Sequence, residues 1–180
     1  MFSPDSEHLL TGSDDGTARV WNTRSGALER TLRGHEGTVR GVSYSDDGRR
    51  ITTAGSDGTV RVWPADSGDA VILVGHEGRV NTAAFDGGGD RLVSAGDDGT
   101  IRIWNAAGGD ALVLLYRHEG IATGADFSGD GRDVVSAGDD GMRITVCEVC
   151  TTTEDVLRVA RTRAQHELSA AERQRLLPDD

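Results

Sequence analysis

Three kinds of side chain that can act together in catalysis recur through this sequence: a histidine, a hydroxyl and a carboxylate. His76, Ser94 and Asp98 form one such group. In a hydrolase, the histidine would take a proton from the hydroxyl nucleophile, and the carboxylate would orient the histidine. The same residue types stand 41 residues earlier, at positions 35, 53 and 57. Because a catalytic set is needed only once, this recurrence favours a structural role that each repeat carries separately.

Short strands are the elements that would position these side chains. The runs TVRGVSY, RITTAG, TVRVW and AVILV are rich in β-branched residues and are bounded by Asp-Gly or other glycine-rich turns. Several runs are apolar on both faces, as expected for strands sandwiched between neighbouring sheets. The pattern predicts four short strands in each unit of ~42 residues, which is typical of a β-propeller blade.

Other landmarks repeat with the same period. Tryptophans lie 42 and 41 residues apart, at Trp21, Trp63 and Trp104. An aromatic residue ends one apolar run of every unit, at Phe2, Tyr44, Phe85 and Phe127. Together, the Gly-His pairs, the Ser or Thr, the Asp-Gly and the Trp resemble the WD-repeat family over residues 1 to about 146. One departure is that Asn or Pro, never Asp, follows each tryptophan.

The resemblance implies an all-β fold: a partial WD-repeat β-propeller of about four blades with a short C-terminal helical tail. We expect blades at about 1–32, 33–74, 75–116 and 117–150, and the tail at 151–180. Phe2 aligns with the end of an inner strand, so the first blade is expected to lack that strand.

The resemblance also implies a buried hydrogen-bonded set in each blade. A buried carboxylate needs donors, histidine can donate, a hydroxyl relays, and the indole N–H is a donor only. The sets are Thr11, Asp15 and Trp21; His35, Thr53, Asp57 and Trp63; His76, Ser94, Asp98 and Trp104; and His118, Ser136 and Asp140. The first set lacks its histidine, and the last has Val146 where tryptophan is expected. We expect the two end blades to be the least stable.

Four units are fewer than a seven-bladed ring, which needs ~294 residues. Three outcomes are open: the chain is the C-terminal part of a longer protein, two copies pair into a ring of about eight blades, or four units close as a small ring. We favour the first. The whole chain is similar to the C-termini of actinobacterial WD-repeat proteins, many of which resemble signal-transduction ATPases with numerous domains. No GxxxxGK[ST] phosphate loop is present.

The last thirty residues predict two helices, the second of which opens with a Ser169-to-Glu172 capping box. Their apolar stripe is expected to cover the last blade, with partner binding as the alternative. Cys147 and Cys150 form a lone CxxC, for which zinc would need further ligands. We interpret them as packing cysteines, with a reversible disulfide second and a metal third.

The charge and composition of the chain limit the classes of molecule that it is expected to bind. The net charge of −11 argues against nucleic acid and anionic membrane as partners. The basic residues are all arginine, a bias that fits a high-GC bacterial gene. The start has no basic and apolar signal-peptide pattern, and no run approaches the ~20 apolar residues of a membrane span. We therefore expect a cytoplasmic protein, and the sequence predicts no metal or other cofactor.

The function that this pattern predicts is a protein-interaction scaffold without catalysis of its own. The resemblance places three possible partner contacts near the start of the inner strands and four beside the Asp-Gly turns. They are Arg40, Asn81 and Thr123, and Asp14, Ser56, Asp97 and Asp139. The turn residues either form a negative rim for a basic partner segment or are ordinary turn formers.

The sequence is compatible with two other functions. The chain is alternatively a detached sensor or regulatory module of a larger bacterial signalling ATPase or kinase. A propeller hydrolase is the remote alternative, because it needs clusters of His, Asp or Glu outside the repeat pattern. His8 and His166 are the only histidines outside the repeat positions, and they lie at opposite ends of the chain.

Overall fold

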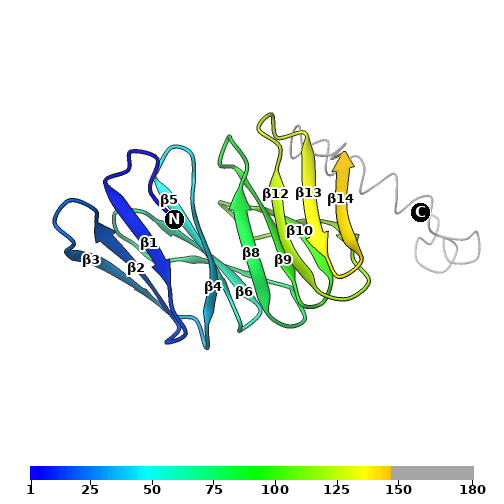
Figure 1. Cartoon of the computed structure of the whole chain (residues 1–180), viewed down its shortest axis with the longest axis horizontal. Coiled ribbons are helices and arrows are strands. Elements are labelled where there is room, and N and C mark those ends of the chain that lie inside the picture. The colour runs from blue at the N-terminus through cyan, green and yellow to red at the C-terminus, as the bar shows by residue number, and fades with distance from the viewer. Residues whose placement is uncertain (147–180) are drawn as a thin grey trace, which may run out of the picture. The chain divides into compact units, whose positions relative to one another are not determined.

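The computed structural model of the protein describes residues 1–146, which form four antiparallel β-sheets (Figure 1). The all-β prediction is therefore confirmed for this part of the chain. Within it, no helix is long and apolar enough to cross a membrane. The predicted tail helices at 151–180, together with Cys147 and Cys150, lie outside the described residues.

The strands of each sheet follow one another in chain order. The first sheet has three strands: β1 (His8–Gly12), β2 (Thr17–Asn22) and β3 (Leu28–Arg33). The second has four: β4 (Val39–Tyr44), β5 (Arg50–Gly55), β6 (Thr59–Pro64) and β7 (Val71–Val74). The third has β8 (Val80–Phe85), β9 (Arg91–Gly96), β10 (Thr100–Asn105) and β11 (Ala111–Arg117). The fourth has β12 (Ala122–Phe127), β13 (Asp133–Gly138) and β14 (Gly141–Val146).

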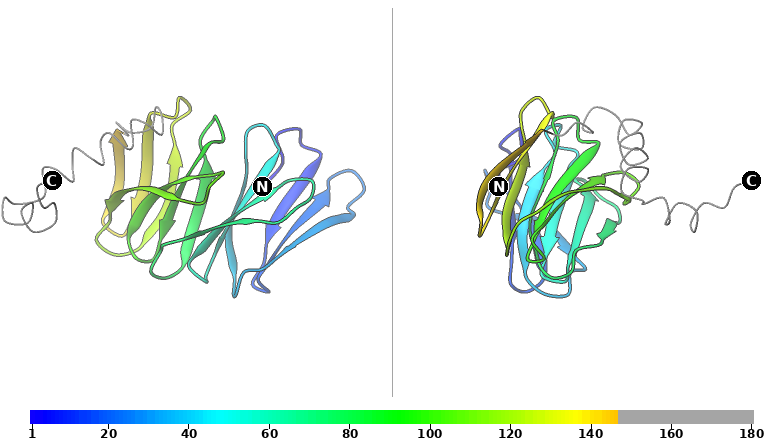
Figure 2. Two further views of the ribbon diagram at one scale, coloured as in Figure 1. Left: turned by 180° about the vertical axis from the view of Figure 1, so that it is seen from behind. Right: turned by 90° about the vertical axis from the view of Figure 1, so that its right-hand side faces the viewer.

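The four sheets stand side by side in an open row. Strand β4 contacts β8, β8 contacts β12, and β1 contacts β4, so the inner strands line one side of the row. The first and last sheets lie at opposite ends in Figure 1 and in the left view of Figure 2. Of the three outcomes weighed for the array, a closed ring of four units is therefore not what these sheets form. In the first sheet, Phe2 bridges Leu9 at the place where the other sheets have an inner strand.

Apolar side chains fill the spaces between neighbouring sheets. One cluster joins the first two sheets and includes Leu10, Ile51 and Trp63. The next joins the second and third sheets and includes Leu73 and Trp104, both fully buried. Burial of each such side chain stabilises the fold by roughly 1.5–3 kcal/mol. In the two central sheets, β5 and β9 are buried along most of their length because a neighbouring sheet covers each face.

Each complete inner strand carries one extra residue near its start. In β4, Val39 pairs with Gly55 and Gly41 pairs with Ala54, so Arg40 has no partner on β5. The same shift makes Asn81 the extra residue of β8 and Thr123 the extra residue of β12. Such β-bulges bend a strand and re-aim the side chain of the unpaired residue.

The Asp-Gly turns between the second and third strands need glycine for two reasons. Gly99 has a φ of +76°, a left-handed conformation that side chains with a Cβ disfavour. A Cβ at this position would also lie 2.5 Å from the carbonyl oxygen of Gly120 and 2.6 Å from that of His118. The turn therefore packs directly under the connection that leads into β12.

The two requirements at Gly99 can be separated experimentally. Gly99→Ala should lower the free energy of unfolding by about 3 kcal/mol, because it adds a backbone clash to the left-handed strain. Gly26→Ala is the matched control, since Gly26 has a φ of +70° and no neighbouring atom within 4 Å of an added Cβ. It should cost only about 1 kcal/mol. Urea denaturation followed by circular dichroism measures both, and equal losses would contradict the close packing of this turn.

Candidate functional site

The third sheet holds four polar side chains in one hydrogen-bonded chain. The Nε1–H of Trp104, on β10, donates to the Ser94 Oγ on β9 at 2.8 Å. Ser94 Oγ lies 2.7 Å from His76 Nε2, and His76 Nδ1 lies 3.0 Å from an oxygen of Asp98. His76 precedes β8 and Asp98 lies in the β9–β10 turn, so the hydrogen bonds tie two strands and two connections together.

Donor chemistry fixes the direction of each bond. The indole N–H is a donor only, so Ser94 accepts from Trp104 and gives its own proton to His76 Nε2. His76 Nδ1–H then donates to Asp98. Burial lowers the pKa of His76, although its bond to Asp98 opposes this shift. Burial would raise the pKa of Asp98, but the donors Glu77 N–H, His76 and Thr100 outweigh burial and lower it to about 2.

The second sheet repeats this arrangement with threonine as the hydroxyl residue. Trp63 Nε1–H donates to Thr53 Oγ1 at 3.0 Å, and Thr53 Oγ1 lies 2.7 Å from His35 Nε2. His35 Nδ1 lies 2.9 Å from Asp57 Oδ2. Burial again lowers the pKa of His35, and hydrogen bonds led by the Glu36 N–H hold the pKa of Asp57 below its usual value against the effect of burial.

The set in the first sheet is shorter. Trp21 donates to Thr11 at 3.0 Å, but no histidine links Thr11 to Asp15. Asp15 instead accepts from the Thr17 hydroxyl at 2.6 Å and from Arg19 Nη2 at 2.5 Å. The bond from Thr17, followed by that from Arg19, lowers the pKa of Asp15.

The set in the fourth sheet keeps its histidine. His118 Nε2 lies 2.8 Å from Ser136 Oγ, and His118 Nδ1 is hydrogen-bonded to Asp140. Tyr116 packs edge-on against the His118 ring, and the Arg143 guanidinium lies 4.2 Å from the centre of the Tyr116 ring. The first sheet thus supplies its own donor, Arg19, for the repeated carboxylate, whereas the fourth-sheet set also contacts Tyr116 of β11 in the third sheet.

These hydroxyl groups are not placed to attack a substrate. Thr53 and Ser94 have no exposed surface, and Ser136 is 3% exposed. In the two complete sets, an indole N–H also occupies the acceptor side of the hydroxyl oxygen. The geometry therefore supports a structural role for all three hydroxyls. Within residues 1–146, no group of three or more His, Cys, Asp or Glu side chains is arranged to hold a metal ion.

Most of the predicted partner contacts lie along the edge of the sheets at which the inner strands begin. A hollow of about 560 Å³ is lined there by Arg40, Asn81 and Thr123, which are the three bulge residues, and by Asp14 and Asp97. We call this surface the bulge hollow. The structure does not bring all seven predicted contacts together, because Ser56 and Asp139 are not among the lining residues.

Hydrogen bonds link the bulge residues of neighbouring sheets. Arg40 Nε donates to Asn81 Oδ1 at 3.0 Å. The Asn81 amide nitrogen donates to the Ala122 carbonyl at 2.9 Å and to Asp97 at 2.8 Å. Asp139 holds the connection before β12, since its carboxylate accepts from the Ile121 N–H at 3.0 Å. The hollow is therefore built from side chains whose positions are fixed by their neighbours.

Sequence reasoning missed four lining residues, Thr38, Val39, Arg79 and Ile121, of which Arg79 and Ile121 change the chemistry of the hollow. Arg79 lies 4.0 Å from Asp97, so the surface mixes both signs of charge and is not a uniformly negative rim. Position 79, two residues before the bulge residue Asn81, was the available signal, because the chain there runs along the same edge. Ile121 is 40% exposed and adds an apolar contact to the hollow.

Comparison with known protein families identifies one matching model. The model described as "WD domain, G-beta repeat" matches residues 1–22, 26–64 and 70–105, which together make up more than half of the chain.

Individual relatives are similar over single repeats. Ribosome assembly protein 4 of Chaetomium thermophilum is 56% identical over 46 residues, which are 25% of this chain and 9% of the relative. WD repeat-containing protein 86 of Homo sapiens is 55% identical over 38 residues, or 21% and 10%. Pre-mRNA-splicing factor PRP46 of Saccharomyces cerevisiae is 50% identical over 42 residues, or 23% and 9%. The chain therefore matches about a tenth of the length of each of these relatives.

Removal of the buried carboxylate should destabilise the fold. Asp98→Ala leaves the donors of His76, Glu77 and Thr100 without their acceptor, and should lower the free energy of unfolding by about 2–4 kcal/mol. Asp57→Ala should behave alike. Asp15→Ala is the matched control, and should lose less because the Asp15 side chain is 48% exposed. Thermal and urea melts measure these effects, and an Asp98→Ala variant as stable as the parent would contradict the buried network.

Stability should also fall with acidification. The pKa of His35 and of His76 is lowered from 6.5 in the folded chain. The unfolded chain therefore takes up these protons first, and the stability present above pH 6.5 is lost as the pH falls below it, by at most about 1.4 kcal/mol per pH unit for each histidine. Urea melts at pH 7.5 and 5.5 should show the loss. His76→Gln should be less stable at both pH values but should show a smaller difference between them; an unchanged difference would argue against a neutral buried His76.

Proposed function

Because the chain belongs to the WD40 repeat family, we propose that it is a protein-interaction scaffold that contacts its partner at the bulge hollow. Proteins of this family act as scaffolds for other proteins and are generally not catalysts. The observation that carries the proposal is the convergence of the bulge residues of β4, β8 and β12 on one hollow.

Rigidity supports this use of the surface. Asp97 in the hollow directly precedes Asp98, whose carboxylate is held by four donor groups. The turn that carries Asp97 is therefore anchored from below. A partner that binds this surface does not have to order it first, and this saves part of the entropy cost of association.

The charges of the bulge hollow indicate the chemistry of the partner. Asp14 and Arg40 are both exposed, and Arg79 lies beside Asp97. We infer that the partner offers a polar segment with a basic group for the carboxylates and an acceptor group for the arginines. The exposed Ile121 provides an apolar contact between them. This proposal modifies the purely basic partner predicted from the turn residues alone.

The alternative role as a sensor or regulatory module of a larger bacterial signalling ATPase or kinase stays a prediction. It concerns the protein in which the array works, and it is compatible with the same binding surface. The DNA upstream of the Met1 codon is its direct test: an in-frame P-loop ATPase or kinase domain would support it, and an unrelated gene would argue against it. The homodimer that would complete a ring is tested by the mass of the chain in solution.

The scaffold proposal is tested by charge reversal in the bulge hollow. The double variants Asp14→Arg with Asp97→Arg, and Arg40→Glu with Arg79→Glu, all at lining residues, should both reduce the proteins captured from a lysate of the source cells by at least tenfold. The readout is quantitative mass spectrometry. We expect both variants to lose the same proteins, because the hollow presents both charges to one partner.

The matched control is Asp69→Arg with Asp110→Arg. Both residues are exposed, lie on the outer connections of the second and third sheets, and change the net charge by the same amount as the first double variant. This control should capture the same proteins as the parent. Unchanged capture by both hollow variants would refute the proposed surface. Loss of capture in the aspartate variant alone would instead support a purely basic partner.

A further inference from the structure

At two of the three junctions between neighbouring sheets, an arginine of one sheet makes a cation–π contact with an aromatic ring of the next. Arg50, the first residue of β5, places its guanidinium carbon 5.3 Å from the centre of the Phe85 ring at the end of β8. Arg91, the first residue of β9, does the same to Phe127 at the end of β12, also at 5.3 Å. The two pairs occupy identical positions in the repeat. A guanidinium over an aromatic face is attracted by the ring electrons and covers the ring from water.

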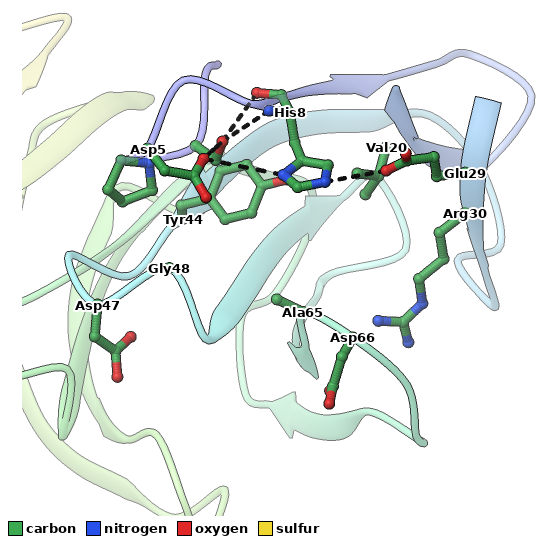
Figure 3. A pocket seen from close by; sticks show the side chains of 12 residues that line it. Asp5, His8, Val20, Glu29, Arg30, Tyr44, Asp47, Gly48, Ala65 and Asp66 are labelled. Carbon is green, nitrogen blue, oxygen red and sulfur yellow. Dashed lines mark hydrogen bonds and ion pairs between the residues drawn. The ribbon is translucent and has the colours of Figure 1, made fainter. Parts of the chain in front are cut away.

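The first junction has different residues at both positions. His8, the first residue of β1, stands where the repeat has arginine, and Tyr44 stands where it has phenylalanine. His8 does not take over the contact as a free cation, because its Nε2 lies 3.0 Å from the Glu29 carboxylate and its Nδ1 lies 4.0 Å from Asp5. A cavity of about 430 Å³ lies at this junction, with His8 and Tyr44 in its wall (Figure 3).

Tyr44 leaves a polar group in the wall of this cavity. The residue is only 7% exposed, and no hydrogen bond joins its hydroxyl to any other side chain or backbone group of residues 1–146. Figure 3 shows the Tyr44 ring inside the pocket, next to Asp5 and His8. Burial, together with the charges of Asp5 and Glu29, raises the pKa of the Tyr44 hydroxyl. The hydroxyl therefore stays neutral and is available for a bond to a ligand.

The other lining groups favour a positive charge. Four carboxylates line the cavity, those of Asp5, Glu29, Asp47 and Asp66. The guanidinium of Arg30, which also lines it, is already hydrogen-bonded to the carbonyl oxygens of Pro64 and Gly68. Four carboxylates thus face two basic side chains, those of Arg30 and His8, in the lining of the cavity.

A backbone group completes the similarity to the other junctions. In the third junction, Arg91 Nη2 lies 3.5 Å from the carbonyl oxygen of Gly131. Gly48 holds the same repeat position in the second sheet and lines the cavity. The first junction therefore offers a guanidinium the counterparts of the aromatic ring and the glycine that receive Arg91 in the third, with the Pro4 ring beside Gly48.

We propose that the cavity between the first and second sheets binds the guanidinium of an arginine side chain from a protein partner. The arginine enters where Arg50 and Arg91 lie in the next two junctions, stacks on Tyr44 and pairs with the carboxylates. This arginine pocket lies at the end of the strands opposite the bulge hollow, since β1 begins at His8 and ends before Asp14. The proposal rests on the scaffold function only for the source of the arginine.

The shape of the site favours arginine over lysine. A guanidinium is planar, stacks on an aromatic ring and donates several hydrogen bonds in the plane of the stack. An ammonium group is compact and strongly hydrated, and it cannot stack in this way. The planar guanidinium satisfies the ring and the carboxylates together.

The test uses the full chain and small probes, so it needs no identified partner. N-acetyl-arginine amide is titrated in, and binding is followed by NMR shifts of the Tyr44 ring. Capped citrulline has nearly the same shape without the charge and should give no saturable shift, and capped lysine should bind more weakly. Free arginine distinguishes an arginine side chain of a protein from the free amino acid as the ligand. The carboxylates of the site should repel the carboxylate of free arginine and weaken its binding. Tighter binding of free arginine than of the capped form would therefore refute a protein ligand. Equal binding of capped arginine and citrulline would refute the guanidinium site.

Variants locate the binding. His8→Arg should fill the pocket from within, as Arg50 and Arg91 do, and should abolish probe binding while raising the melting temperature. Glu29→Gln should weaken binding through loss of one carboxylate, and Asp110→Asn, an exposed control on the β10–β11 connection, should not change it. A His8→Arg variant that melts at or above the parent temperature and still binds capped arginine would overturn the proposal. If His8→Arg does not fold, unchanged affinity in Glu29→Gln decides against it.

The proposals for the arginine pocket and for the bulge hollow can be refuted independently. The variant Asp14→Arg with Asp97→Arg should keep full affinity for capped arginine even where it captures no partner. Loss of probe binding in the His8→Arg variant together with unchanged partner capture by the hollow variants would support the pocket and refute the hollow.

Discussion

A buried carboxylate in the turn between the second and third strands is the interaction on which each complete sheet depends. The Asp98 side chain is 4% exposed and must be matched by donors, because an unpaired buried charge costs several kcal/mol. Its donors come from the turn itself, at Thr100, and from the connection before β8, at His76 and Glu77. One charge therefore fixes the turn against the start of the inner strand, and Ser94 and Trp104 extend this constraint into the sheet.

The position of this buried carboxylate explains why the bulge hollow has a fixed shape. Where the connection is held by Asp98, the inner strand has to enter the sheet from a fixed point, and the extra residue Asn81 lies just inside that point. The same holds for Arg40 in the second sheet, whose connection is held by Asp57. Gly41 lets β4 and β8 approach, since a Cβ there would lie 2.9 Å from the Asn81 carbonyl oxygen. The bulge hollow is thus the outer side of a buried electrostatic network.

The sequence predicts what each repeat carries in itself, and not what two neighbouring repeats make together. Recurrence of His, Ser or Thr, Asp and Trp predicts the strands and the polar sets, because their spacing is local. The bulges leave no mark in that spacing, since an inserted residue shared by all units does not disturb the period. The mixed charge of the hollow depends on Arg79 facing Asp97 across a turn. The contact of Arg50 with Phe85 joins two sheets and becomes visible only when the sheets are placed side by side.

Departures from the repeat differ in whether the chain compensates for them internally. Asp15 lacks a histidine, but Arg19 donates to it at 2.5 Å, so this departure is absorbed within the sheet. Asp140 keeps His118, Tyr116 packs against the His118 ring, and Arg143 lies over the Tyr116 ring. At the first junction, His8 pairs with Glu29 instead of covering Tyr44, and the Tyr44 hydroxyl receives no partner from residues 1–146. Where a repeat residue is replaced and other side chains of the sheets take over its contacts, as at Asp15, the position has a structural role alone. At Tyr44 no side chain of that part of the chain takes over the contact, and the residue lines a charged cavity. This difference favours a contact that another molecule supplies.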